Sequence, residues 1–584
     1  VFTPEDLTDQ HQLIAQTARE FVSKEVIPRI SDLEDPAKKH ALSRQLLGKA
    51  AELGLTAAQI PEAYGGLGLD KMSTLVIAEE MAAQGSFSST FGTQVGIGSL
   101  PIVFFGTEEQ KTQYLPRLAA AEMVGAYCLS EATSASDAMN ARTKATLSPD
   151  GSHYLLNGTK MWITNGGFAD LFTVFAKIDG EKFTAFLVER STPGLTVGAE
   201  EKKMGIRGSS TAPLVLEDAR VPTANVLGEI GKGHRIAFNI LNFGRLKLGA
   251  SCVAACRELI EESVKWAKER VAFGRPIADY GLIKEKLGEM IVRAYAGRSM
   301  AYRTMGMIES LSEVPDSDSP GPSAKILEVM QEYAVECSIM KVFGAETLDF
   351  VVDQAVQIHG GYGYSAEYRV EQAYRDSRIN RIFEGTDEIN RLLLVNMLLK
   401  RSLKGELGLI SAAKNLLEET LTAPSALPER GDSGQPLAVE ARWVEGARKA
   451  VLLVAGSAVE RYQKALSEEQ EIIGALANMV IEVYAMESCL LRTLKNIQRK
   501  GGNSGGGQEI GCDATRAAVC QGLDRVEAEG RRALARIGEG DTRRIQLSLL
   551  RKFLKRTPVD VIALKRRVAD RAIELGRYPF SARA

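Results

Sequence analysis

The apolar residues of this chain change their spacing twice, and this change constrains the fold more than any other feature. From residue 3 to about residue 122 they recur three and four positions apart, as in LIAQTAREFV and STLVIAEEMAA, which is typical of amphipathic helices. Between residues 125 and 227, β-branched and aromatic runs such as LFTVFAKIDGEKFTAFLVE predict strands. Helical spacing then returns and lasts to about residue 403. We therefore predict a mostly α-helical chain with a central β-domain, whose later helices form a four-helix bundle.

The domain organisation follows from the same pattern and from the length of 584 residues, which suggests several domains. The stretch TAPSALPERGDSGQP is rich in Pro, Gly and Ser and is typical of a linker. Helical spacing resumes after it. We predict an N-terminal helical domain (1–124), a middle β-domain (125–232), a helical bundle (233–403), a linker (404–438) and a C-terminal helical domain (439–584).

One internal repeat links the two helical bundles. MIVRAYAGRSMAYRT, from Met290, aligns with MVIEVYAMESCLLRT, from Met479, with Met, Tyr, Ala, Ser, Arg and Thr shared. Shared helical patterning is one explanation. The other is that the tail is a second bundle descended from the first, without its reactive loop.

Composition excludes several classes of function. A net charge of -2 gives no overall attraction to nucleic acid, and 25% charged with 45% hydrophobic residues is typical of a soluble globular protein. Seven cysteines without a CxxC pair and five scattered histidines indicate neither a disulfide framework nor a metal site. We expect a reducing compartment and no bound metal.

The tail carries a basic amphipathic run, RRIQLSLLRKFLKR. Its apolar face beside Arg and Lys could rest on an anionic membrane surface. A helix packed in the second bundle with solvated charges is the more common outcome, and we favour it. No stretch reaches the roughly 18 to 20 uninterrupted apolar residues of a membrane span.

The stretch RIFEGTDEIN contains an acid whose place needs an explanation. Thr386 is a good N-cap and the following acids suit the start of a helix. Glu384 belongs to none of that, because it precedes Gly385 on a turn held by Ile382 and Phe383. A carboxylate there could point into a pocket, although such acids are more often solvated.

Four further stretches accompany RIFEGTDEINR in a fixed order: AYCLSEATSASD, KMWITNGG, ERVAFGRPI and QIHGGYGY. Together they resemble the acyl-CoA dehydrogenase family over about residues 5 to 400. The resemblance implies an acyl-CoA dehydrogenase fold and a flavoenzyme with FAD that oxidises fatty acyl thioesters between the α and β carbons. The additional helical domain resembles that of the very-long-chain branch, which implies a homodimer.

The resemblance also implies roles for individual residues. Glu384 matches the catalytic base, and the position that carries the base in other members is Gly244 here. Contacts to the substrate fall on Ser136, Asn242, Phe243, Arg245 and Gly385. Contacts to FAD fall on Leu129, Ser130, Ser136, Trp162, Thr164, Arg270, Phe273, Gln357, Gly360, Gly361, Thr386 and Glu388, with the residues from Arg270 to Gly361 usually acting across a subunit boundary.

This chain departs from the family at Ala132 and Ala135, where we expect a shifted loop, and at Gly281 and Lys284, where adenine-side contacts are in doubt. The segment SFSSTFGTQVGIGSLP offers little bulk where the acyl pocket of the family ends. A deep pocket for long chains is one interpretation, and close helix packing is the other. The small residues concerned are Ser88, Ser89, Gly92, Gly96 and Gly98.

We therefore predict FAD-dependent dehydrogenation of fatty acyl-CoA, with long chains favoured, to trans-2-enoyl-CoA in fatty acid β-oxidation. The resemblance implies an electron-transferring flavoprotein as acceptor. An acyl-CoA oxidase that uses oxygen is the alternative within enzymes, and a non-catalytic scaffold on this fold is the alternative outside them. We expect a cytoplasmic protein, or one of the mitochondrial matrix if eukaryotic, with peripheral membrane contact through the tail as an option.

Overall fold

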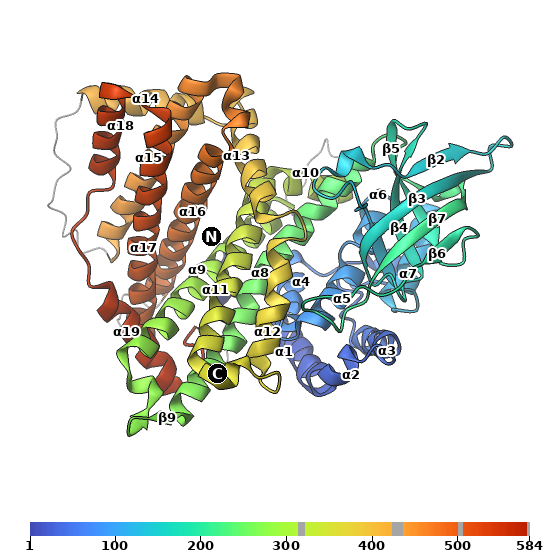
Figure 1. Cartoon of the computed structure of the whole chain (residues 1–584), viewed down its shortest axis with the longest axis horizontal. Coiled ribbons are helices and arrows are strands. Elements are labelled where there is room, and N and C mark those ends of the chain that lie inside the picture. The colour runs from blue at the N-terminus through green and yellow to red at the C-terminus, as the bar shows by residue number, and fades with distance from the viewer. Residues whose placement is uncertain (313–321, 423–435, 500–505, 581–584) are drawn as a thin grey trace.

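The computed structural model describes residues 1–312, 322–422, 436–499 and 506–580. The N-terminal helices and the β-domain lie on one side, the central bundle in the middle and the C-terminal helices on the other side (Figure 1). The predicted mostly helical chain with a central β-domain and a second C-terminal bundle is therefore confirmed.

The N-terminal helices begin where the sequence supplies caps. Asp70 accepts a hydrogen bond from the Ser73 amide (2.6 Å) at the start of α4. Thr107 and Gln110 form a capping box at the start of α7 (3.2 and 3.1 Å). The helices are α1 (Asp9–Phe21), α2 (Ile30–Glu34), α3 (Lys39–Glu52), α4 (Lys71–Met81), α5 (Gly85–Val95), α6 (Leu100–Phe105) and α7 (Glu108–Ala119).

The middle domain is an eight-stranded sheet in the order β6-β7-β3-β2-β4-β5-β8, with β1 added in parallel to β4. A register shift between Lys160 and Ile163 on β3 marks a bulge, at which Trp162 takes a positive φ of 62°. The strands are β1 (Gly125–Cys128), β2 (Lys144–Leu147), β3 (His153–Thr164), β4 (Leu171–Ile178), β5 (Lys182–Glu189), β6 (Leu195–Val197), β7 (Thr211–Pro222) and β8 (Val226–Leu227).

The central bundle consists of four long helices and two shorter ones. Two of the long helices, α8 and α11, pack against each other, and the others pack around them. Close packing of α8 on α11 requires Gly249 and Gly344, since a Cβ on either would lie 2.2–2.3 Å from the opposite backbone. The helices are α8 (Gly233–Glu269), α9 (Gly281–Ser312), α10 (Pro322–Glu332), α11 (Ala334–His359), α12 (Arg369–Ser377) and α13 (Asp387–Leu403), and a hairpin of β9 (Val271–Ala272) and β10 (Arg275–Pro276) follows α8.

The segment 404–438, predicted as a linker, is partly helical, which corrects that prediction. Helix α14 (Leu409–Thr422) forms there because its apolar residues recur at helical spacing, and Leu416 is buried. Residues 423–435 lie outside the described residues. The second bundle continues with α15 (Ala438–Tyr462), α16 (Gln470–Arg499), α17 (Gly506–Ile537), α18 (Gly540–Phe553) and α19 (Val561–Leu575).

The two copies of the internal repeat lie on α9 and α16, which pack against each other. Tyr295 of α9 hydrogen-bonds Thr493 of α16 through their hydroxyls (2.7 Å). The equivalent residues make the reciprocal contact, because Tyr484 of α16 hydrogen-bonds Thr304 of α9 (2.8 Å). The two helices are thus related by a local twofold axis.

The same exchange holds for the arginines of the repeat. Arg492 donates to the Ser299 hydroxyl (3.3 Å), and Arg303 donates to the Ser488 hydroxyl (3.2 Å). Four reciprocal contacts between equivalent residues favour descent of the second bundle from the first over shared helical patterning.

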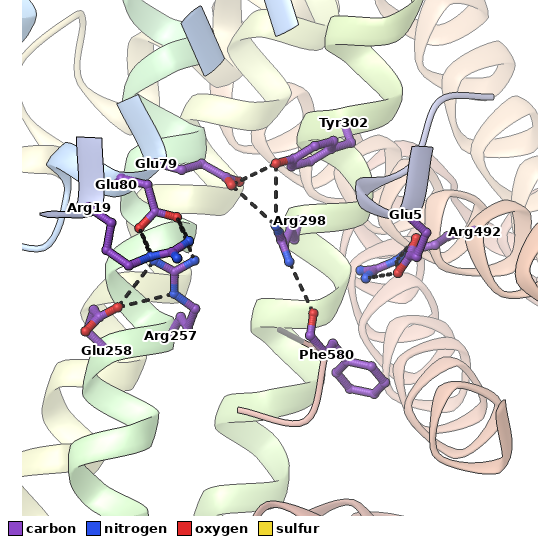
Figure 2. A network of polar contacts seen from close by, with 10 residues as sticks. All are labelled: Glu5, Arg19, Glu79, Glu80, Arg257, Glu258, Arg298, Tyr302, Arg492 and Phe580. Carbon is purple, nitrogen blue, oxygen red and sulfur yellow. Dashed lines mark hydrogen bonds and ion pairs between the residues drawn. The ribbon is translucent and has the colours of Figure 1, made fainter. Parts of the chain in front are cut away.

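Buried charges tie the parts of the chain together (Figure 2). Arg298 of α9 lies 3.5 Å from Glu79 of α4 and donates to the carbonyl of Phe580 near the C-terminal end (3.2 Å). Arg492 of α16 pairs with Glu5 at the N-terminal end (2.6 Å). Both ends of the described chain are therefore held against the bundles.

The apolar residues of the second bundle's helices are mostly packed against other helices. Among the described residues α16 alone is long and apolar enough to span a membrane, but it packs against α9 and α17 and buries Arg492. On α18, Leu550 is buried in the core, whereas Ile545 is exposed. Leu547, Leu549 and Phe553 are partly buried against the same core, so most of the apolar face of the basic run is used in packing.

Candidate active site

The turn that carries Glu384 has an unusual backbone. Glu384 has a φ of 58° and Gly385 a φ of 85°. Residues other than glycine rarely adopt such positive φ values. Arg245 donates from Nε to the Glu384 carbonyl (3.1 Å), and Asn390 donates from Nδ2 to the Gly385 carbonyl (2.9 Å). Thr386 caps α13 as predicted, because its Oγ1 accepts from the Ile389 amide (3.3 Å). These hydrogen bonds thus hold Glu384 in its left-handed backbone conformation.

The carboxyl of Glu384 lies against the backbone of Gly244 on α8. A Cβ at Gly244 would stand 3.0 Å from the Glu384 Cδ and Oε2, so any larger residue here would have to displace the carboxyl. The Oε2 atom is buried and has no hydrogen-bond partner in the described chain. The position that carries the base in other family members is thus next to the same carboxyl.

Burial changes the acidity of this group. Desolvation raises the pKa of Glu384 to about 7, although the positive charges of Arg245 and Lys341 oppose the shift. The side chain keeps some accessible surface, but it is enclosed by protein and its open side faces a cavity. A carboxyl of this kind can take up or release a proton near neutral pH.

The cavity beside Glu384 has a volume of about 250 Å³ and runs between α4, α5 and α8. Four of the small residues of α5 and the turn after it line the cavity. Gly98 does not, and a Cβ there would lie 3.0 Å from the Gly125 carbonyl, so this position serves close packing. Four of the five residues therefore line the cavity and the fifth serves close packing, while the preference for long chains stays a prediction. The lining includes Ile77, Ser88, Ser89, Phe91, Gly92, Gly96, Thr164, Phe243, Gly244 and Glu384.

Several predicted site residues come together here. Thr164 and Phe243 line the cavity with Glu384. Asn242 accepts from Arg245 (3.1 Å), so these two predicted substrate residues form one unit behind the Glu384 turn.

Leu129 and Ser130, which follow β1, do not line the cavity but are held against β3. The carbonyls of Leu129 and Ser130 accept from Lys160 Nζ (3.3 Å) and from the Met161 amide (2.9 Å). Trp162, next along β3, is 56% exposed. Ser136 and Glu388 are also exposed, and neither lines the cavity.

A further group of predicted residues lies far from Glu384. Arg270 follows the end of α8, whereas Gly244 lies near its start, about 40 Å away at 1.5 Å per residue. Arg270 stacks on Tyr362 (5.5 Å), and Phe273 is 98% exposed. Gln357, Gly360 and Gly361 are exposed close to Tyr362 at the end of α11. One chain does not bring the two groups together, and a contribution across a subunit boundary stays a prediction.

Two of the four departures from the family pattern, Gly281 and Lys284, lie against helix α19. Lys284 pairs with Asp570 of α19 (2.6 Å), and Gly281 lies against Arg566 of the same helix. These positions therefore contact the additional domain. In the altered loop, Glu131 and Ser134 form a bridge (2.8 Å), and the Glu131 side chain pairs with buried Lys160 (2.7 Å).

Sequence reasoning missed several residues that support the site. Lys341 of α11 pairs with Asp387 at the start of α13 (2.6 Å), and both are buried. Asn390 holds the turn, as described above. Their signal was weak, because a polar residue in a helix is usually solvated. A stronger signal was Lys247, a lysine among apolar residues one turn after Gly244.

Comparisons with known proteins agree with this geometry. The family models for the N-terminal, middle and C-terminal domains of acyl-CoA dehydrogenase match residues 8–122, 126–219 and 231–399, and another described as an acyl-CoA dehydrogenase C-terminal domain matches residues 446–552. A probable acyl-CoA dehydrogenase of Bacillus subtilis is 49% identical over 99% of this chain and 96% of its own length.

Two further relatives concern the branch of the family and the cofactor. The mitochondrial very long-chain specific acyl-CoA dehydrogenase of Homo sapiens is 37% identical over 81% of this chain and 74% of its own length. A crystal structure of an acyl-CoA dehydrogenase from Bacillus anthracis complexed with FAD superimposes with a TM-score of 0.95 at 48% identity, covering 99% of this chain and 97% of that one.

The chain therefore belongs to the acyl-CoA dehydrogenase family. It is an FAD-dependent acyl-CoA dehydrogenase, homologous to the very-long-chain enzymes. The residues present fit the cofactor. Gly360 and Gly361 leave open space where a Cβ would lie, so a phosphate could approach the backbone, and the exposed ring of Trp162 offers a face for a flat ligand.

Proposed function

We propose that this enzyme converts saturated fatty acyl-CoA thioesters to trans-2-enoyl-CoA, with Glu384 as the base that removes the α-proton. The observation that carries the proposal is the buried Glu384 carboxyl, which faces the cavity from a left-handed turn and has a pKa of about 7. An α-proton of a thioester is weakly acidic, so its removal needs a base whose own pKa is high.

The charge that develops on the thioester oxygen needs hydrogen-bond donors. The amide of Gly385 follows the base directly, and within the described part of the chain neither its nitrogen nor that of Glu384 donates to a backbone carbonyl. Arg245 and Asn390 fix the carbonyls of the same turn. We propose that this turn holds both the base and an oxyanion donor.

FAD supplies the electron acceptor to which the β-hydrogen leaves as hydride. Thr164, Trp162 and the Leu129–Ser130 backbone would hold it beside the cavity. Loss of the α-proton to Glu384 and of hydride from the β-carbon leaves the trans-2 double bond, so electrons and atoms balance.

The substrate class that we propose is long-chain acyl-CoA. Small residues on α5 line the far wall of the cavity, and a Cβ at Gly92 would meet no atom within 4 Å. Relatives named as very long-chain specific support the same conclusion. We place the reaction in fatty acid β-oxidation, with an electron-transferring flavoprotein as acceptor.

The assembly that we propose is a homodimer. Exposed Phe273 and Tyr364 lie at the end of the central bundle with the open Gly360 and Gly361 backbone. Along α8, about 40 Å separates Gly244, which contacts Glu384, from Arg270, which lies beside Tyr362 in this group, so we propose that these residues complete the cofactor site of a partner chain.

An anaerobic titration with palmitoyl-CoA tests the function. We expect the visible flavin absorbance of the purified holoenzyme to bleach, and the Glu384→Gln variant to bind the thioester without bleaching. If wild type keeps its flavin absorbance with palmitoyl-CoA and with shorter and branched thioesters, the proposal is wrong.

Two alternatives give different results in the same assay. An oxidase would produce peroxide in air without another acceptor, whereas we expect little peroxide until an electron-transferring flavoprotein is added. A scaffold would keep its biological effect in the Glu384→Gln variant, whereas we expect growth on long-chain fatty acid to be lost.

A further inference from the structure

The cavity wall contains a lysine to which neither the family comparisons nor the reaction assigns a role. Lys247 lies on α8 three residues after Gly244, and Leu248 and Ser251 follow on the same helical face. All four residues line the cavity. Lys247 is thus one helical turn, about 5 Å, beyond the position that touches the base.

The amine of Lys247 is buried and has no hydrogen-bond partner within the described ranges. Its neighbours on the wall differ, because Ser251 donates to the Ala78 carbonyl (3.3 Å) and Thr74 donates to the Lys71 carbonyl (2.8 Å). An unpartnered buried amine is unfavourable, since it loses its hydration without replacement. Among the described residues that line the cavity, Lys247 Nζ and Glu384 Oε2 are thus the buried side-chain atoms without a hydrogen-bond partner, and Lys247 is the one that can donate to a ligand.

The electrostatic surroundings favour an oxygen ligand. Burial and the positive charge of nearby Lys71 lower the pKa of Lys247 to about 7. The groups that act on Glu384 are Arg245 and Lys341, so Lys247 is not the partner of the base. A negative or hydrogen-bond-accepting oxygen beside the amine would relieve both the lost hydration and the repulsion from Lys71.

We propose that Lys247 binds an oxygen substituent on the distal part of the acyl chain, so that the enzyme accepts acyl-CoA thioesters carrying a carboxylate or a hydroxyl beyond the reacting carbons. This inference rests on the proposed function, because it places the acyl chain in the cavity beside Glu384. A lysine has three donors and suits either group. The reacting carbons stay at Glu384, and the substituent lies at least one turn of α8 deeper.

The test compares matched thioesters in the FAD-loaded enzyme. Unsubstituted, ω-hydroxy and ω-carboxy acyl-CoA of the same chain length are measured over a series of lengths, by kcat/KM and by calorimetric affinity. In wild type we expect one length at which an oxygenated thioester matches or exceeds its unsubstituted parent. A hydrogen bond to a charged group changes the ratio of oxygenated to unsubstituted substrate by about 10- to 100-fold, and we expect Lys247→Met to remove that factor.

One further variant distinguishes recognition of a hydroxyl from recognition of a carboxylate, and another controls for structural damage. Lys247→Gln keeps a donor without charge, so it should retain selectivity for hydroxyl and lose selectivity for carboxylate. Lys265→Met replaces an exposed lysine of the same helix that does not line the cavity, and the ratio should not change. General damage to the fold would lower kcat/KM and affinity for all the substrates together and leave the ratio of oxygenated to unsubstituted substrate unchanged.

Equal ratios in wild type and Lys247→Met at every length, by both kinetics and affinity, would overturn the inference. That result would leave the proposed function intact as long as the unsubstituted thioesters bleach the flavin. If no thioester reacts, the proposed function fails, and the calorimetric ratios still decide whether Lys247 recognises oxygen.

Discussion

At the scale of single residues, the acidity of Glu384 sets the pH dependence of the reaction. Its folded pKa of about 7 lies above the ordinary value of 4.5 because burial disfavours the anion. The base must be unprotonated to accept the α-proton, so kcat/KM for palmitoyl-CoA should fall about tenfold per pH unit below pH 7 and level off above it. A profile that stays flat between about pH 5.5 and pH 8 would contradict this assignment.

The same pKa predicts an effect on stability. A carboxyl with a raised folded pKa binds more protons when folded, so it lowers stability as pH rises from about 4.5 to 7. The shift corresponds to about 3 kcal/mol above pH 7. Glu384→Gln should therefore raise the thermal unfolding temperature of the substrate-free holoenzyme at pH 8 and leave it nearly unchanged at pH 5. An equal change at both pH values would point to packing as the cause.

At the scale of elements, the start of α13 depends on a buried ion pair. Lys341 of α11 and Asp387 are both almost fully buried and 2.6 Å apart. Lys341→Met would leave Asp387, within the described residues, with Arg381 at 3.5 Å as its ion-pair partner, so we expect a loss of about 3 kcal/mol in unfolding free energy. Removing the positive charge should also move the pH profile to higher pH, because Lys341 lowers the pKa of Glu384.

Denaturant unfolding and the pH profile check this pair. The double variant Lys341→Met with Asp387→Asn should recover part of the lost stability, since it leaves no unpaired charge. If the double variant loses the sum of the two single losses, the residues do not act as a pair. A flavin content equal to that of wild type confirms that the cofactor site has survived.

Elements were more predictable than the contacts between them. The change of spacing at residue 125 predicted the β-domain, and Thr386 was predicted as a cap, because both depend on neighbours in sequence. Glu384 and Gly244 were each singled out, but their contact joins residues far apart in the chain. The pairing of Lys284 with Asp570 likewise depends on how α9 packs on α19. Helix α14 was not predicted, because the whole segment 404–438 was assigned as a linker from the Pro- and Gly-rich stretch that follows the helix.

At the scale of the whole molecule, the contact between α9 and α16 covers a face of α9 that two chains could otherwise share. Tyr295, Ser299, Arg303 and Thr304 lie on α9 and meet their equivalents on α16 in reciprocal pairs. A surface that meets a copy of itself about a twofold axis is isologous, as in symmetric dimers. Here the partner is part of the same chain, so this face is already covered.

Removal of the second bundle should therefore expose a self-complementary face. In a truncated chain of residues 1–403, two copies of α9 could make the Tyr295–Thr304 and Arg303–Ser299 contacts with each other. We expect the full-length protein to be a homodimer and the truncated protein to associate further, to a tetramer, as measured by light scattering. Arg303→Met in the truncated chain should weaken that step, because it removes the donor to the Ser299 hydroxyl from both copies. A truncated protein that keeps its helical content and flavin but has the same number of copies as the full chain would show that α9 does not pair with itself.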